Sequence, residues 1–245
     1  MNTDFARLLR MELKLTARDP LVLTFVFVFP VVTMLIIGGS FGTKPDPSFG
    51  GVNPSHWYVA SYITVVVAAT GLIMVPVHLA SYRERGVLRR FAVAGFARWS
   101  FVLAQLAVGL VVVVAASLIL LAVAAPVYGV PTLQGSGRVL AALGLGAVAF
   151  VSLGVVLGTV LPSARAAQAV GLILFFPSFL LGAGGPPPHV MGAALRGVAR
   201  FLPLTLVTDA VRDPWLGLGP ATGSLVAVAV MAVLATSLAA RRAAL

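Results

Sequence analysis

The sequence lacks cysteine and is poor in charged residues. None of its 245 residues is cysteine, which excludes a disulfide framework and thiolate metal ligands. Only 10% of the residues are charged, whereas soluble domains carry about 25%. Hydrophobic residues make up 60% of the chain and the mean hydropathy is +1.05. The composition is therefore that of an integral membrane protein without a separate soluble domain.

Residues for nucleotide or metal chemistry are also missing. The only lysines are Lys14 and Lys44, and neither is followed by serine or threonine, so the sequence holds no P-loop. The three histidines are scattered, with no carboxylate or second histidine at ligand spacing: His56, His78 and His189. No metal site is predicted from them. The chain is therefore not expected to be an enzyme on its own or to carry a cofactor.

Six apolar runs could each cross a membrane, which takes about 20 residues. They cover residues 21–41, 57–80, 101–125, 139–161, 168–184 and 221–240, of which 168–184 is at the short limit. None contains Asp, Glu, Lys or Arg, which argues against an ion-driven carrier and leaves any pathway to Gly, Ser, Thr, Gln and aromatic residues. Gly154 and Gly158 form a small-xxx-small pair that predicts close helix packing or a subunit interface.

Six spans put both termini on one side of the membrane. Twelve of the 17 Lys and Arg residues then fall on that side and five on the other. The positive-inside rule predicts that both termini lie on the cytoplasmic side of a bacterial inner membrane. The net charge of +10 is accordingly assigned to orientation and to lipid headgroups rather than to nucleic acid.

Residues 1–20 are predicted to form an amphipathic helix lying in the inner headgroup layer, ended by Asp19 and Pro20. Its apolar residues recur at helical spacing: Phe5, Leu8, Leu9 and Leu13. Its basic residues gather on another face: Arg7, Arg10, Lys14 and Arg18. A simple anchor and a docking element are equally compatible with this pattern.

Residues 81–99, SYRERGVLRRFAVAGFARW, form a basic segment between the second and third runs. Ser81 and Glu84 fit a capping box that would start a helix, and Gly95 would end it. Val87, Leu88, Phe91 and Ala94 share one arc, and Arg83, Arg85, Arg89 and Arg90 occupy the opposite half. The apolar arc could rest on lipid or fill a groove on a cytoplasmic partner.

Residues 185–220 follow the fifth run on the external side. Two short helices are expected, 190–201 and 204–212, separated by Pro203 and bounded by Pro188 and Pro214. Each is too short to cross, so they could lie on the surface or enter as re-entrant helices. Asp209 and Arg212 can pair because they are three residues apart.

Three stretches resemble the ABC-2 type permease subunits, of which drug exporters of the daunorubicin-resistance type are a typical branch. They are RDP before the first run, ERGVLRRFAVAGFARWSFVLAQL after the second, and FLPLTLVTDAVRD in the external segment. In the second stretch the matching residues are Glu84, Arg85, Gly86, Val87 and Leu88, whereas Gly95 replaces a common proline and Arg89 a common acid. In the third they are Pro203, Leu204, Thr205, Asp209, Ala210 and Arg212, and Leu202 replaces the usual Asn.

The resemblance implies an all-α, single-domain permease that dimerises and binds two separate ATPase subunits, which would hold ATP and Mg. Its parts would be the amphipathic helix (1–20), spans 1–2 (21–80), the coupling segment (81–99), spans 3–5 (100–184), the external re-entrant segment (185–220) and span 6 with its tail (221–245). The implied coupling residues are Arg83, Glu84, Arg85, Gly86, Val87, Leu88, Arg89, Arg90 and Phe91. The implied external residues, near the exit, are Pro203, Asp209 and Arg212.

The sequence therefore predicts an exporter permease for amphipathic drugs or lipid-like compounds. A permease for a glycolipid or polysaccharide is the alternative within transport. A membrane scaffold without a pathway is a third hypothesis. The fourth, an intramembrane hydrolase, depends on the nucleophile-elbow pattern at 38–42, but that pattern ends an apolar helix and no base is evident nearby.

Overall fold

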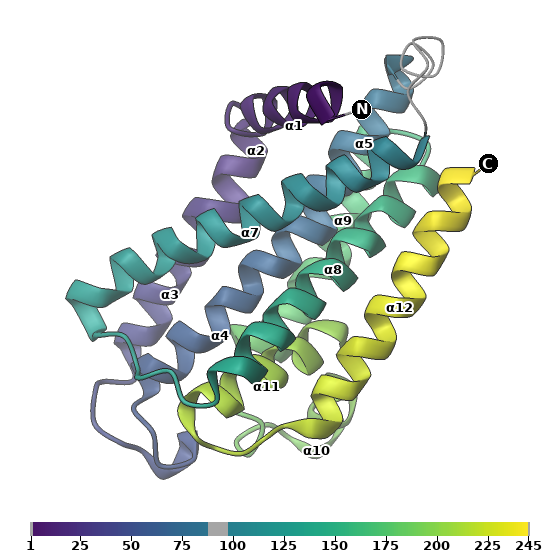
Figure 1. The fold of residues 1–245 in the computed structure, drawn as a ribbon. Helices are drawn as coiled ribbons and strands as arrows, with labels where there is room; N and C mark the ends of the chain where they lie inside the picture. Colours follow the sequence, from purple (N-terminus) through teal and green to yellow (C-terminus); the bar gives the residue numbers. More distant parts are fainter. Residues whose placement is uncertain (1, 88–97, 245) are drawn as a thin grey trace.

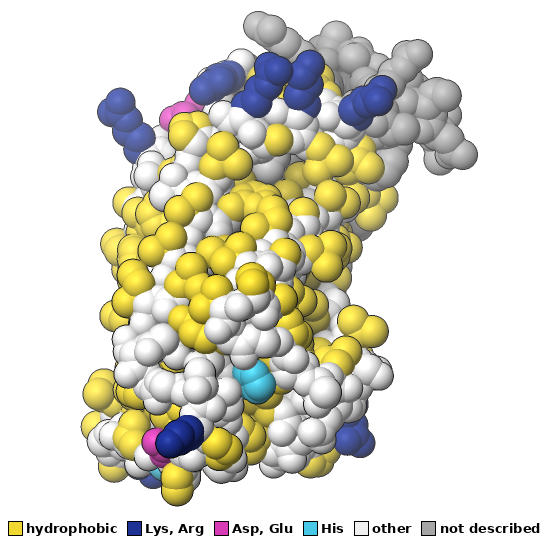
Figure 2. Space-filling model, turned by 90° about the vertical axis from the view of Figure 1, so that its left-hand side faces the viewer, with side chains coloured by type: hydrophobic (Ala, Val, Ile, Leu, Met, Phe, Trp, Pro, Cys, Tyr) yellow, Lys and Arg dark blue, Asp and Glu magenta, His cyan; other side chains and the backbone are white. Residues whose placement is uncertain are grey.

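The computed structural model describes residues 2–87 and 98–244 of the chain, and these form helices joined by loops, with no strand in either range (Figure 1). Six helical segments are long and apolar enough to cross a membrane. Figure 2 shows one face of the molecule, where Lys and Arg side chains gather at the two ends and hydrophobic side chains cover much of the length between them. The predicted all-α membrane fold with six spans is confirmed.

Several spans are built from more than one helical stretch. Span 1 comprises α2 (Pro20–Val22), a π-helical stretch (Leu23–Val28) and α3 (Phe29–Ser40), and span 2 comprises α4 (Pro54–Ala69), a π-helical stretch (Thr70–Met74) and α5 (Val75–Glu84). Span 3 lies in α7 (Arg98–Tyr128), span 4 is α8 (Ser136–Val160), span 5 is α9 (Ala164–Ser178) with a π-helical stretch (Phe179–Ala183), and span 6 is α12 (Thr222–Ala244). Outside the spans lie α1 (Asn2–Thr16), a short 3₁₀ turn (Pro47–Phe49), α10 (Ala193–Ala199) and α11 (Pro203–Leu216).

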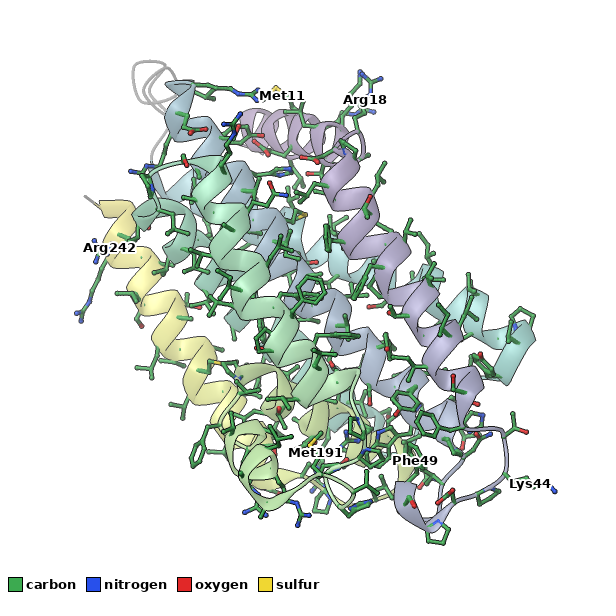
Figure 3. The ribbon with its side chains drawn as sticks, turned by 180° about the vertical axis from the view of Figure 1, so that it is seen from behind. Met11, Arg18, Lys44, Phe49, Met191 and Arg242 are labelled. Atoms are coloured by element: carbon green, nitrogen blue, oxygen red, sulfur yellow. The ribbon has the colours of Figure 1, made fainter. Side chains whose placement is uncertain are left out.

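The bundle has two distinct ends. Helix α1 lies across one end, where the described parts of both chain termini and the end of α5 are also found (Figure 1). Helices α10 and α11 lie at the other end, together with the loop that carries Lys44 and Phe49 (Figures 1 and 3). We call these the α1 end and the α10 end.

Span 2 is the centre of the bundle. In its most apolar stretch 89% of the residues are buried within the protein, against 17% for span 6. Helix α4 packs against α3, α7, α8 and α11. A helix that is apolar on all sides is expected in such a position, because every face then meets another helix.

Span 2 changes its helical winding just before Pro76. The Val75 N–H donates to the carbonyl of Thr70, and Pro76 has no N–H to give, so neither residue satisfies the carbonyl of Gly71. Gly154 of α8 packs directly against that carbonyl, and Gly171 of α9 packs against the carbonyl of Leu72. A Cβ atom on either glycine would collide with these oxygens, so the helices pack this closely only because these two positions carry no side chain.

Gly158, one turn further along α8, makes a similar contact with the side chain of Leu79, about two turns further along span 2. The predicted small-xxx-small face of α8 is therefore used within the chain. It packs α8 against span 2, which leaves both glycines buried and unavailable as a separate subunit interface.

Helix α5 does not stop where the apolar run stops. The predicted helix start at Ser81 is wrong, because α5 continues through Glu84 and the Arg85 N–H donates to the Ser81 carbonyl. The helix ends at Gly86, whose φ of +67° is in the left-handed region. Backbone hydrogen bonding carries the helix past the last apolar residue, since charged side chains at the end of a span do not oppose it. The predicted end at Gly95 lies outside the described residues.

Other predicted boundaries also shift. Helix α10 is shorter than the predicted 190–201, and α11 runs through Pro214 to Leu216 rather than ending before it. A proline in the last turn removes only one helical hydrogen bond, and Gly217, with φ +71°, ends the helix instead. Span 5 begins at Ala164, where the Ser163 hydroxyl accepts a hydrogen bond from the Ala166 N–H, so it reaches 20 residues rather than 17.

Replacing Gly154 with alanine should destabilise the protein by about 1–3 kcal/mol, because the new methyl group meets the Gly71 carbonyl. Gly144→Ala is the matched control on the same helix, since its Cβ would have no heavy atom within 4 Å. We expect a lower midpoint of thermal unfolding in detergent for Gly154→Ala and an unchanged or raised midpoint for Gly144→Ala. Equal midpoints for the two variants would contradict the close contact between α8 and span 2.

Candidate functional site

A cluster of polar side chains lies between α1 and the bundle. Glu12 is 1% exposed and faces spans 2 and 3. Its Oε2 atom accepts a hydrogen bond from the Tyr82 hydroxyl at 2.9 Å and lies 3.4 Å from the Gln105 Nε2 donor. Glu12 therefore connects α1 to α5 and α7 at once.

A second acidic residue ties α1 to span 2. Asp19 accepts hydrogen bonds from the Leu21 and Val22 N–H groups through Oδ1, so it caps α2 rather than simply ending α1, which stops at Thr16. Its Oδ2 atom lies 2.8 Å from His78 Nε2. The hydrogen bond with His78 lowers the pKa of Asp19 below its usual value. The sequence places no carboxylate at ligand spacing from His78, and the fold supplies one from a distant part of the chain.

The cluster is not fully satisfied. Glu12 Oε1 and Gln105 Oε1 have no hydrogen-bond partner among the described residues. Burial raises the pKa of Glu12 above its ordinary value of 4.5, and this effect exceeds the opposing effects of the Tyr82 hydrogen bond, the charge of His78 and the Gln105 hydrogen bond. A buried carboxyl group with one unpaired oxygen is a costly element at a helix interface, so its presence calls for a specific reason.

The described part of the basic segment, residues 81–87, includes Tyr82 of this cluster and the residues that follow it. Arg83 donates from Nη1 to the carbonyls of Gly158 and Leu161, both at 3.1 Å, and so caps the end of α8. Glu84 and Arg85 are exposed, whereas Gly86 and Val87 are half-buried. Four of the predicted coupling residues lie outside the described residues: Leu88, Arg89, Arg90 and Phe91. Arg83 is thus at least in part a structural residue.

At the α10 end, Arg212 is buried among three partners. Its Nη2 atom lies 2.6 Å from Asp209 Oδ1, which is the pair that the sequence predicts, and its Nε atom donates to Asp213 Oδ1 at 3.0 Å. The guanidinium carbon also stands 3.8 Å from the centre of the Trp57 ring. Arg212 is 4% exposed, and its burial is made possible by the two carboxylates and the indole.

Pro203 has a different place. It is the first residue of α11, where a proline fits because that N–H would have no helical partner. An open pocket of about 270 Å³ lies beside Arg212 and does not include Pro203 among its lining residues, which are Gly50, Trp57, Pro188, His189, Asp209, Arg212, Asp213 and Leu218. The structure therefore joins Asp209 and Arg212 in one cluster and leaves Pro203 as a helix start.

Aromatic rings form a continuous ladder between the two ends. In order from the α1 end, the rings belong to Phe25, Phe29, Phe179, Tyr62, Tyr58, Phe41, Phe49 and Trp57, and successive ring centroids lie 5.2–6.2 Å apart. Phe175 and Phe176 add further edge contacts to Phe29. Spans 1, 2 and 5 contribute most of these rings, and the last ring holds Arg212.

Sequence reasoning missed the cluster under α1 and two partners of Arg212. Glu12 lies three residues after Leu9 and four before Thr16, which places it on the inward face with them, and His78 and Tyr82 are four residues apart on span 2. These spacings in the sequence could have indicated the cluster under α1. Trp57 and Asp213 gave none, because their roles depend on how α4 and α11 meet. Among the described residues no group of His, Asp or Glu side chains could hold a metal ion.

The raised pKa of Glu12 predicts a pH dependence that Glu12→Gln should remove. When the folded-state pKa exceeds the unfolded value, ionisation disfavours the folded state, so stability is lost as pH rises from about 4.5 through the folded pKa. Thermal unfolding of both proteins in detergent from pH 4 to pH 8 measures this. We expect the stability of Glu12→Gln relative to the native protein to increase with pH. A difference that stays constant or shrinks with pH would contradict burial of an ionisable Glu12.

Comparison with known proteins agrees with this architecture. The sequence model described as ABC-2 type transporter matches residues 3–215, which cover α1, the first five spans and most of α11. A search of curated proteins found no match to the chain. The matched range includes the basic segment, Glu12 and the Arg212 cluster. The chain belongs to the ABC-2 type transporter family.

Proposed function

We propose that this chain is the permease subunit of an ATP-driven exporter in a bacterial plasma membrane, working as a pair of copies with two copies of a separate ATPase. The family membership supports a role in transport. The sequence has no P-loop, so the nucleotide and its Mg would be held by the ATPase subunit. The drug-exporter branch is proposed on the resemblance of the segments at 84–88 and 203–212.

The aromatic ladder is the observation that carries the choice of cargo. The apolar runs 21–41, 57–80 and 168–184 supply most of the rings, and none of them contains Asp, Glu, Lys or Arg. A path lined by such rings offers apolar contact and stacking but no fixed charge, which suits amphipathic drugs or lipid-like molecules. The Arg212 cluster at the end of the ladder supplies polar groups where cargo would leave.

The orientation is proposed from charge. The α1 end carries most of the basic residues, and the positive-inside rule assigns it to the cytoplasm. Helix α1 would then lie in the inner headgroup layer, with Arg10, Met11, Lys14 and Leu15 exposed on its outer side. The pocket beside Arg212 would open on the outer side of the membrane.

Single cysteines test this orientation, because the native chain has none. Lys44 and Arg242 are exposed and lie toward opposite ends of the bundle (Figure 3). Lys44→Cys should react with an impermeant maleimide on intact cells, and Arg242→Cys only after permeabilisation. Labelling in the reverse pattern would invert the proposed topology.

The basic segment is the proposed contact with the ATPase. Span 2 continues as one helix through Glu84 into this segment, so a push on the segment acts directly on the central span of the bundle. Val87 is only half-buried within the chain, and Leu88 and Phe91 share its arc in the sequence. These apolar residues would fill a groove on the ATPase.

Leu88→Asp should disrupt that contact. Burying a leucine contributes about 1.5–3 kcal/mol, so its loss weakens binding tenfold or more. Arg85→Ala is the control, because an exposed ion pair contributes about 0–1 kcal/mol. We expect Leu88→Asp, at equal protein level, to lose co-purification of the co-expressed ATPase and ATP-dependent uptake of a fluorescent amphipathic dye into inside-out vesicles. Arg85→Ala should retain most of both.

Other outcomes separate the alternatives. Dye transport that continues without ATP and collapses with a proton uncoupler would contradict an ATP-driven permease. ATP turnover stimulated by a glycolipid or an oligosaccharide, but not by amphipathic dyes, would favour the polysaccharide or glycolipid branch. Full ATPase binding by both variants would mean that the segment rests on lipid.

A further inference from the structure

The Glu12 carboxyl group holds together the two ends of the basic segment. Tyr82, its partner on α5, is the second residue of the segment, and Gln105, its partner on α7, lies six residues after the segment ends. Residues at the two ends of the segment therefore meet at one oxygen atom of a third element, α1. Tyr82 and Gln105 need no hydrogen bond to each other, because each bonds to Glu12.

Helix α1 and the short link that follows it are held to span 2 at two points, one on α1 and one at Asp19 in the link. Glu12 bonds to Tyr82, and Asp19 lies 2.8 Å from His78, one helical turn before Tyr82. His78 and Tyr82 stack with ring centroids 6.5 Å apart. Two contacts at successive turns prevent α1 from pivoting about a single one, so α1 and the end of span 2 are expected to move as one body.

Stability alone does not account for Glu12. Apolar residues in place of both Glu12 and Gln105 would bury apolar surface without the unpaired oxygens Glu12 Oε1 and Gln105 Oε1. A carboxyl group instead gives a contact that is directional and depends on the positions of both donors. Such a contact suits a joint whose geometry matters more than its strength.

We propose that Glu12 is a positioning residue that couples displacement of the basic segment to spans 2 and 3 together, through α1. This rests on the proposed function, in which an ATPase moves that segment. When Glu12 is present, both ends of the segment shift with α1. When it is absent, the segment moves at span 2 without carrying span 3, and ATP is hydrolysed without transport.

The first experiment measures dye transported per ATP hydrolysed by the complete complex. Glu12→Ala should retain ATPase co-purification and ATP turnover while transport per ATP falls about tenfold or more, as the loss of hydrogen bonds to a buried carboxyl predicts. Glu12→Gln keeps an acceptor oxygen for Tyr82 and should restore coupling to within about threefold of the native complex. Leu15→Ala, on the exposed side of α1, should leave the ratio unchanged.

Combined substitutions test the contact itself. Adding Tyr82→Phe and Gln105→Leu to Glu12→Ala should lower transport per ATP little further, because the effects of substitutions at residues that act through one contact are not additive. Tyr82→Phe is also the second test if Glu12→Ala fails to fold, since it removes one hydroxyl from span 2 and should lower the ratio by itself. Additive losses would overturn the proposal.

A structural measurement makes the result independent of transport. Thr16, the last residue of α1, is 3% exposed on its inward face, and its hydroxyl has no partner among the described residues, so Thr16→Cys should report docking of α1 without breaking a hydrogen bond. We expect slow maleimide labelling of Thr16→Cys, rapid labelling when Glu12→Ala is added, and slow labelling with Glu12→Gln. Leu15→Cys, 48% exposed, should label rapidly in every background.

Two results would overturn the proposal. If Glu12→Ala exposes Thr16→Cys but leaves transport per ATP unchanged, Glu12 is only structural. If labelling of Thr16→Cys is the same with and without Glu12, the carboxyl does not hold α1. Failure of the native chain to bind any ATPase would instead overturn the proposed function. The labelling pattern needs no ATPase, so it would still show whether Glu12 holds α1.

Discussion

Close contact of neighbouring helices with the backbone carbonyls of span 2 around Gly71 is the constraint on which the bundle depends. Pro76 and the preceding π-helical stretch leave the Gly71 carbonyl without its usual donor, and Gly154 and Gly171 allow two neighbouring helices to reach this region. In a membrane the free oxygen cannot turn to water, so the protein must cover it. Spans 4 and 5 are therefore positioned by backbone atoms, and the rest of the bundle follows from them.

The same central span links the two functional regions. At one end, Trp57 on α4 faces Arg212, and at the other, His78 and Tyr82 on α5 meet the acidic residues Asp19 and Glu12. The aromatic ladder follows span 2 between them. A displacement of span 2 would reach both the Arg212 cluster and α1, which is an arrangement suited to a protein that must open one end in response to the other.

The sequence predicted the spans, the helical class and the Asp209–Arg212 pair because each depends on local information. Apolar run length gives a span, and spacing of three residues gives a helical pair. It did not predict the end of α5, since the helix continues past the last apolar residue to Gly86. It missed Glu12 and the Trp57–Arg212 contact for a different reason: both join segments far apart in the chain, and no local spacing reports such a contact. The coupling role of Leu88, Arg89, Arg90 and Phe91 stays a prediction.

The partners of Glu12 also determine when α1 can reach its final position during synthesis. Helix α1 is made before the spans, whereas Tyr82 follows only at the end of span 2 and Gln105 only once part of α7 has been made. Until then the Glu12 carboxyl can remain hydrated at the membrane surface at little cost. Docking of α1 is thus a late step that requires three correctly inserted spans, and an undocked α1 marks a chain whose insertion is incomplete.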